Sequence, residues 1–374
     1  MNFINQCENC ILDNTVEDIS FNEKGVCNYC EGYHDRKSKH SYSKADLEAL
    51  VQRVKKPDQK YDCIVGISGG LDSSYLLHKA KQLGLNPLAV HCDSGWNSET
   101  ASHNIEILTK KLNVDLYTYV VDWDEFKSLQ KACLKAGVID LEFPTDHVYL
   151  AALFFAADKY NIKTIFTGNN LWSEGIMPDC WIHNKGDSLN MTDIYKKQSK
   201  LKVLRHLPVL GLKRKFYYYN ICRIKNIFLL NYLNYDRSAA LKELQDVYNW
   251  QQHVTKHGET IYTRFYHRYI LPKRFNIDIR KAHLSSLICC GQITKDEALN
   301  QLSQEIYPTE VMEADKKYIL KKLDITEAEF GSMMNMKRVS HTAYRSETRL
   351  KIIYNRLRTL PLGFNYLLNI SNHC

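Results

Sequence analysis

Short apolar runs alternate with amphipathic segments over the first half of the chain, and this alternation predicts an α/β fold. Strands are expected at 61–67, 87–92, 116–121 and 164–167. Helices are expected at 47–54, 75–84, 99–112, 125–136 and 146–160. The apolar run from Val148 to Ala157 has ten residues, too short to cross a bilayer and typical of a buried helix. The order of strands and helices is that of a doubly wound parallel sheet.

Beyond about residue 201 the pattern changes from strands to helices rich in aromatic residues. Segments 216–219 and 227–232 contribute much of the chain's count of 24 tyrosines. Basic side chains follow these segments. The arginines suit binding of a diphosphate, and the tyrosines suit stacking on a base or sugar. The alternative is a solvated basic face over an aromatic core. We therefore predict three parts: residues 1–40, 41–200 and a helical 201–374.

Composition places the chain among globular proteins and excludes disorder and collagen-like repeats. Its 374 residues are 44% hydrophobic and 25% charged. Residues 1–8 show neither the basic nor the apolar region of a secretory signal, so a cytoplasmic protein is expected. The net charge of +8 suits an enzyme that handles phosphates as well as an RNA binder.

Four of the twelve cysteines form an ordered pair of knuckles. Cys7 and Cys10, then Cys27 and Cys30, follow C-x2-C-x16-C-x2-C spacing, which is typical of a four-thiolate structural zinc site. A redox pair or an iron–sulfur cluster is the alternative. The remaining cysteines of the later chain lack metal spacing and are expected to be small buried hydrophobes: Cys180, Cys222, Cys289 and Cys290.

The segment Ser68–Ser74 reads Ser-Gly-Gly-Leu-Asp-Ser-Ser and joins a buried strand to a helix. Glycines admit close approach of backbone N–H groups, serines add donors, and the helix dipole favours negative charge, so an anion site is predicted. An ordinary strand-to-helix turn is the alternative. Neither a Walker loop nor a dinucleotide-binding G-x-G-x-x-G is present.

This loop resembles the S-G-G-x-D-S signature of the PP-loop ATP pyrophosphatases of the N-type. Further segments look like the N-acetyl sugar amidotransferases of bacterial surface-polysaccharide and nonulosonic-acid pathways, at 143–147, 167–178, 262–275, 278–285 and 290–294. The resemblance extends to about residue 335. It implies a doubly wound parallel sheet with ATP at the carboxyl ends of the strands, an N-terminal zinc ribbon and a helical C-terminal part.

The resemblance also implies an activity. Such enzymes use ATP and Mg²⁺ to adenylate the oxygen of an acetamido group on an activated, nucleotide-linked sugar. Ammonia, supplied by separate glutaminase and cyclase-like partners, then displaces AMP to leave an acetamidino group. A tRNA-modifying PP-loop enzyme, for thiolation or lysidine synthesis, is the alternative. The modest charge and the absence of a C-x-x-C pair in the catalytic half disfavour nucleic acid. A third interpretation is a zinc-ribbon binding module with a vestigial nucleotide fold.

Residue roles carry over by matching position. ATP and its magnesium are assigned to Ser68, Gly69, Gly70, Asp72, Ser73, Ser74 and Gly168. Catalysis is assigned to Asp72, Asp93, Asn169 and Glu174, and sugar binding to Arg264 and Lys273. Structural alternatives stay open: Asp72 as a helix cap, Asp93 as a turn residue, and His147 as a residue that stabilises a helix start.

Residues 337–374 depart from the resemblance. They are strongly basic, and Leu350, Ile353, Tyr354 and Leu357 fall on one helical face. Two interpretations remain: a helix docked on its own domain, or an amphipathic helix for a membrane surface or a partner.

Overall fold

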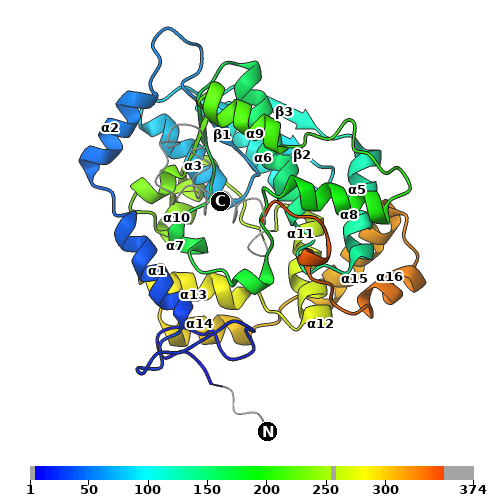
Figure 1. The fold of residues 1–374 in the computed structure, drawn as a ribbon. Coiled ribbons are helices and arrows are strands. Elements are labelled where there is room, and N and C mark those ends of the chain that lie inside the picture. Colours follow the sequence, from blue (N-terminus) through cyan, green and yellow to red (C-terminus); the bar gives the residue numbers. More distant parts are fainter. Residues whose placement is uncertain (1–4, 254–257, 349–374) are drawn as a thin grey trace, which may run out of the picture.

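A five-stranded parallel sheet forms the centre of the chain in the computed structural model, which describes residues 5–253 and 258–348 (Figure 1). The strands are β1 (Cys63–Gly66), β2 (Pro87–Asp93), β3 (Leu116–Val120), β4 (Thr164–Phe166) and β5 (Lys225–Ile227). Their order is β3-β2-β1-β4-β5. β1 therefore pairs with β2 on one side and β4 on the other, which is the switch point where α/β sheets bind ligands.

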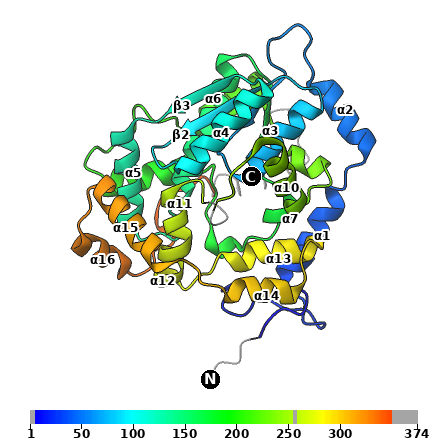
Figure 2. The same cartoon turned by 180° about the vertical axis from the view of Figure 1, so that it is seen from behind.

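Helices cover both faces of the sheet because successive strand residues point to opposite sides. Cys63 and Val65 of β1 pack with α3 (Leu71–Gln82), α4 (Glu99–Leu112) and α10 (Arg237–Tyr248), the layer nearest the viewer in Figure 2. Ile64, between them, packs on α6 (Phe143–Lys159) on the other face. Thus the predicted doubly wound parallel sheet is confirmed, and α6 is the buried helix expected from its apolar run.

The fifth strand corrects the prediction that the chain beyond residue 201 is helical. β5 is only three residues long, Lys-Asn-Ile, and pairs with β4 at the edge of the sheet. It lacks the apolar run of a buried strand, so periodicity does not reveal it. The sheet thus takes a strand from the part of the chain that follows residue 200.

The rest of the chain is mainly helical. The remaining helices near the sheet are α2 (Lys44–Val54), α5 (Trp123–Ala136), α7 (Leu171–Glu174), α8 (Ser188–Gln198) and α9 (Leu212–Phe216). The C-terminal helices are α11 (Ile261–Phe265), α12 (Leu271–Phe275), α13 (Arg280–Cys290), α14 (Lys295–Ser303), α15 (Thr309–Leu323) and α16 (Glu327–Met334). No helix in the described ranges is long and apolar enough to cross a membrane.

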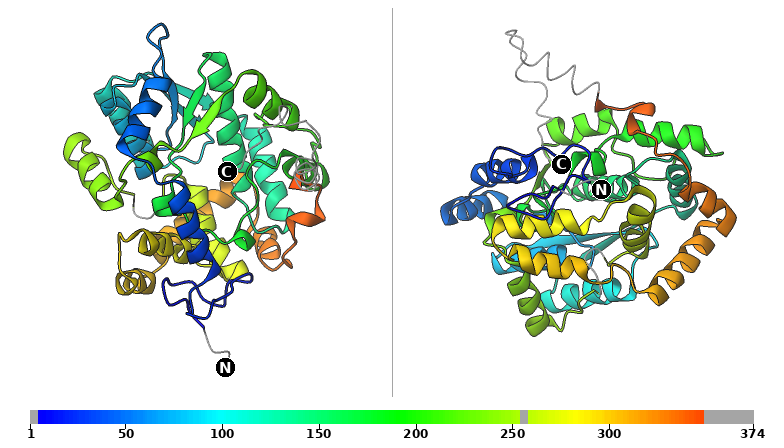
Figure 3. Two further views of the ribbon diagram at one scale, coloured as in Figure 1. Left: turned by 60° about the vertical axis from the view of Figure 1, so that its left-hand side comes forward. Right: turned by 90° about the horizontal axis from the view of Figure 1, so that it is seen from below.

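The N-terminal segment is built onto the C-terminal helices. Helix α1 (Asn28–Lys39) packs on α13, and the two run side by side in Figures 1 and 3. An ion pair of 2.6 Å between Lys281 Nζ and Asp13 Oδ2 joins the same regions. Residues between Cys7 and Tyr33 therefore share a hydrophobic core with the C-terminal helices.

The last described residues are also anchored. Glu347 is buried and pairs with Lys215 of α9 at 2.6 Å, and His341 stacks on His183 at 4.0 Å between ring centroids. The amphipathic face predicted at 350–357 lies outside the described residues.

Candidate functional site

The segment Ser68–Ser74 lies at the carboxyl end of β1 and leads directly into α3. Serine side chains hold its shape: the Ser68 N–H donates to Ser73 Oγ at 3.1 Å, and the Gly70 N–H donates to Ser68 Oγ at 3.3 Å. Gly70 is the N-cap of α3, and no side chain accepts a hydrogen bond at this cap. The first-turn amides thus keep the donor capacity that suits a phosphate, as the sequence predicts for an anion site.

Close backbone packing explains two glycines of the site. Gly69 has a φ of 81°, and a Cβ there would lie 2.5 Å from the carbonyl oxygen of Ala101 in α4. Gly168, which follows β4, lies against the loop, because its Cβ would be 3.0 Å from the Ser73 nitrogen. Neither position has room for a side chain. β4 brings Gly168 to the loop, and its role in binding ATP stays a prediction.

Three side chains that sequence reasoning did not assign hold the loop from the segment 248–253 and from α4. The Trp250 indole N–H donates to Ser74 Oγ at 3.1 Å. His253 Nε2 and Asn104 Nδ2 both donate to the Gly69 carbonyl, at 2.9 and 3.2 Å. The signal for them is tertiary, because about 180 residues of sequence separate Trp250 and His253 from the loop.

Asp72 faces the space between the loop and α7 and does not cap its own helix. Its Oδ1 accepts a hydrogen bond from the Tyr235 hydroxyl, and its Oδ2 lies 3.4 Å from Ser173 Oγ. Burial, with the charges of Asp72 and Glu174, raises the pKa of Tyr235, so this tyrosine stays a hydrogen-bond donor. Asp72 and Glu174 are thus brought to the same side of the loop.

Asp93 and Asn169 also lie at the carboxyl edge of the sheet. Asp93 ends β2, and its Oδ1 accepts from the Gly95 N–H at 2.8 Å, as its turn role predicts. Asn169 is exposed between Gly168 and the cap of α7. His147 is structural: its Nδ1 donates to the Lys185 carbonyl and its Nε2 accepts from the Leu210 N–H, each at 2.9 Å.

The four N-terminal cysteines converge on one point. Cys7, Cys10, Cys27 and Cys30 are buried, with sulfurs within 4.8 Å of one another. Sulfur separations of 3.9 Å (Cys7–Cys30) and 3.8 Å (Cys10–Cys27) match the ~3.8 Å expected for tetrahedral zinc with Zn–S bonds of about 2.3 Å. The residues thus fit a four-thiolate metal site.

Cys289 of α13 borders this site, which its spacing does not reveal. It is buried as predicted, and its Sγ lies 3.5 Å from Cys30 Sγ. For Cys180, Cys222 and Cys290 the prediction of full burial is wrong, because each is partly exposed. They lie in loops or at helix ends, where a small apolar residue need not be covered.

The C-terminal part of the chain is similar to a known protein family. Residues 259–358 match the family described as LPS biosynthesis protein WbpG-like, C-terminal domain. Over these residues the chain is similar to the WbpG-like family. The resemblance to a surface-polysaccharide family is thereby confirmed. The first residue of this region, Glu259, lies against the loop Ser68–Ser74, since a Cβ on Gly70 would lie 2.8 Å from Glu259 Oε1.

Other known proteins resemble this chain at low sequence identity. The uncharacterized protein MJ1599 of Methanocaldococcus jannaschii is 24% identical over 272 residues, which are 64% of this chain and 93% of that protein. An NH3-dependent NAD synthetase from Campylobacter jejuni has a TM-score of 0.33 at 13% identity, covering 82% of this chain and 98% of that one. The U34-tRNA thiolase NcsA from Methanococcus maripaludis, with its [4Fe-4S] cluster, has a TM-score of 0.34 at 10% identity, covering 85% and 89%.

Within the WbpG-like region, the two residues assigned to the sugar lie apart from each other. Arg264 of α11 forms a bidentate ion pair with Asp315 of α15, with Nε and Nη2 at 2.7 and 2.8 Å from the carboxylate. Lys273 of α12 is exposed. Arg264 thus joins two helices of the WbpG-like region, and the sugar-binding role of both residues stays a prediction.

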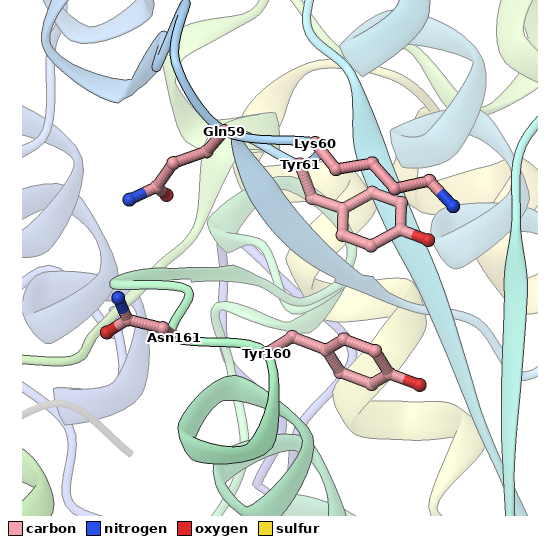
Figure 4. Close-up of a pocket in the computed structure, with 5 residues that line it drawn as sticks. All are labelled: Gln59, Lys60, Tyr61, Tyr160 and Asn161. Carbon is pink, nitrogen blue, oxygen red and sulfur yellow. The ribbon is translucent and has the colours of Figure 1, made fainter.

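A shallow hollow of about 340 Å³ lies at the other end of the sheet (Figure 4). Its lining residues precede β1 or follow α6: Gln59, Lys60, Tyr61, Tyr160 and Asn161. Because these are the amino ends of the strands, the hollow is remote from Ser68–Ser74. It has no part in the phosphate site.

Proposed function

We propose that this protein is an ATP-dependent, AMP-forming amidotransferase that converts the acetamido group of an activated sugar into an acetamidino group. One observation carries the proposal: the first residue of the WbpG-like region, Glu259, lies against Gly70 of a PP-loop signature. This contact supports a single site shared by an ATP-using loop and a region named for lipopolysaccharide biosynthesis. An ATP-activated step on a sugar precursor accounts for both.

The chemistry requires the amide oxygen to become a leaving group. It attacks the α-phosphorus of ATP, the bond to the bridging β-phosphate oxygen breaks, and pyrophosphate leaves. The amide N–H proton passes to solvent, which leaves a neutral imidate. Ammonia then adds to the imidate carbon while the C–O bond to AMP breaks. The protein's contribution is positioning and charge stabilisation around phosphates, for which fixed backbone donors are well suited.

The residues at the loop divide this work. The amides at the amino end of α3 and the hydroxyls of Ser68, Ser73 and Ser74 would hold the phosphates. The carboxylate of Asp72, within the loop, and that of Glu259, beside Gly70, would supply the oxygen ligands that Mg²⁺ prefers. When bound, the ion would neutralise phosphate charge.

Substrate and ammonia delivery extend the proposal. The sugar is nucleotide-linked, with Arg264 and Lys273 assigned to its side of the site, and separate glutaminase and cyclase-like proteins supply ammonia. The four-cysteine site carries structural zinc. The packing of α1 on α13 supports a role in holding the N-terminal segment on the WbpG-like region.

The test is release of AMP and pyrophosphate by the purified protein with ATP, Mg²⁺ and ammonium. Nucleotide-linked diacetamido sugars are compared with bulk tRNA as substrates. The mass of the sugar product is measured to detect replacement of oxygen by NH. Sugar-dependent AMP with that mass change is expected. The matched variants are D72N, expected to be inactive, and D58N, an exposed aspartate at the amino end of the sheet, expected to be active. AMP formation that depends on tRNA instead would overturn the proposal in favour of RNA modification.

A further inference from the structure

The start of α6 holds a buried carboxylate that does not cap the helix. Helix starts are commonly capped by the residue before the first turn, here Glu142. Asp140 caps this helix instead, because its Oδ1 accepts from the backbone N–H groups of Glu142 and Phe143, at 3.1 and 2.9 Å. Glu142 makes no side-chain cap hydrogen bond. Its carboxylate is therefore available for another partner.

That carboxylate is only partly paired. Glu142 is 7% exposed, and its Oε2 accepts a hydrogen bond from Thr263 Oγ1 at 2.7 Å. Its Oε1 is buried and has no hydrogen-bond partner among the described residues. A buried oxygen of this kind carries a desolvation cost that a donor would remove.

Two further buried oxygens beside Glu142 share this condition within the described part of the chain. They are the hydroxyls of Thr145 and Tyr262. Thr145 lies three residues after Glu142 on the same helix face, and Tyr262 precedes the Thr263 that binds Glu142. Burial raises the pKa of Tyr262, and so does the negative charge of Glu142. All three oxygens can accept a hydrogen bond, and none has a partner among the described residues.

The charges around Glu142 favour a small cation. Lys185 is held by Asp140 and Asp146, at 2.8 and 3.0 Å, so its charge is already shared between two carboxylates. Burial raises the pKa of Glu142 to about 8, and the charges of Asp146 and Asp140 add to this, against the Thr263 hydrogen bond and Lys185. The negative charge of Glu142 also raises the pKa of Tyr149 and Tyr266. This carboxylate can thus hold or release a proton near neutral pH.

The cluster is connected to the phosphate loop. Helix α6 leads into β4, so its amino end lies at the carboxyl edge of the sheet, where Ser68–Ser74 also lies. Thr263 Oγ1, which binds Glu142, receives a hydrogen bond of 2.5 Å from Thr260 Oγ1, next in sequence to Glu259 at Gly70. Thus one short segment spans the cluster and the loop.

We propose that Glu142 Oε1, Thr145 Oγ1 and Tyr262 Oη bind an ammonium ion and that Glu142 accepts its proton. This inference rests on the proposed function. One N–H bond of ammonium breaks and the proton passes to Oε1 of Glu142. The freed nitrogen lone pair forms the C–N bond to the imidate carbon, the C–O bond breaks, and its electron pair leaves on AMP. The three remaining protons stay on the amidinium product.

The test compares two nucleophiles on the full-length protein. Hydroxylamine is unprotonated at neutral pH and needs no base to free its lone pair. We expect E142Q to lose at least ~100-fold in ammonium-dependent amidine formation, a typical contribution of a proton-transfer group. The rate of hydroxylamine-dependent amidoxime formation by E142Q should stay within about threefold of the wild-type rate, because this nucleophile needs no proton transfer to Glu142. Equal losses with both nucleophiles, or none with ammonium, would overturn the inference.

The matched control is E125Q. Glu125 of α5 is equally buried, but its carboxylate accepts three backbone N–H groups, from Arg205, His206 and Leu207, at 2.7, 2.9 and 3.0 Å. E125Q should lower thermal stability and leave the ratio of the two activities unchanged. If E142Q does not fold, T145V and Y262F take its place. Each is expected to raise the KM for ammonium several-fold, with equal potassium chloride as the salt control. An unchanged KM in both would overturn the binding site. A wild type that forms no amidine would refute the proposed function instead.

Discussion

Removal of one sulfur from the N-terminal cluster tests whether it holds a metal. The change is C10A, because Cys10 Sγ lies 3.8 Å from Cys27 Sγ and accepts the Leu12 N–H at 3.5 Å. Its control is C133A. Cys133 is equally buried in the same core, is carried by α5, and is absent from the cluster.

The two losses differ in size if a metal is bound. Structural zinc sites contribute about 10–16 kcal/mol, so one ligand of four represents roughly 3 kcal/mol. Loss of a methylene-sized group from a core costs about 1 kcal/mol. With about 2.1 cal/mol/K of unfolding entropy per residue, a chain of 374 residues should lose roughly 4 °C in Tm for C10A and about 1 °C for C133A.

The assay is elemental analysis of the purified proteins combined with thermal unfolding by circular dichroism. Wild type and C133A should hold one zinc per chain, and C10A should hold much less. Iron in place of zinc would replace the zinc assignment with an iron–sulfur cluster. A metal-free wild type, or equal Tm losses in the two variants, would refute the reasoning.

Other predictions concern the loop and a buried histidine. D72N should lower sugar-dependent AMP formation by about 10²–10³-fold, the typical effect of one lost charge-stabilising group, while the circular dichroism spectrum is unchanged; activity near wild type would contradict this. G168A, whose Cβ would meet the Ser73 nitrogen at 3.0 Å, should raise the KM for ATP about tenfold (~1.4 kcal/mol), whereas G331A, which has open space in α16, should leave activity unchanged and add about 0.5–1 kcal/mol of stability. Burial lowers the pKa of His147 from 6.5 to about 4, so the stability of the folded chain should fall by up to ~3 kcal/mol as pH drops through that window. Denaturant unfolding at pH 7 and pH 4 should show this slope for wild type and a smaller one for H147Q.

The sheet and the phosphate loop were predictable because their signals are local. A run of apolar residues predicts each of β1 to β4 and the helices between them, and Ser68–Ser74 carries its glycines and serines in one turn. β5 escaped prediction because three residues at a sheet edge bury too little apolar surface to leave a pattern. Its pairing with β4 depends on the folded sheet.

The sequence by itself determined the elements, the phosphate loop and the metal-ligand spacing, since each depends on residues a few positions apart. Tertiary structure alone decided which distant groups meet: Glu259 at Gly70, Cys289 at Cys30, and Thr263 at Glu142. More than 100 residues separate the members of each pair, and only packing brings them together. Likewise, Glu142 reads as an ordinary charged residue in the sequence. Burial and the capping of α6 by Asp140 make it a candidate for chemistry.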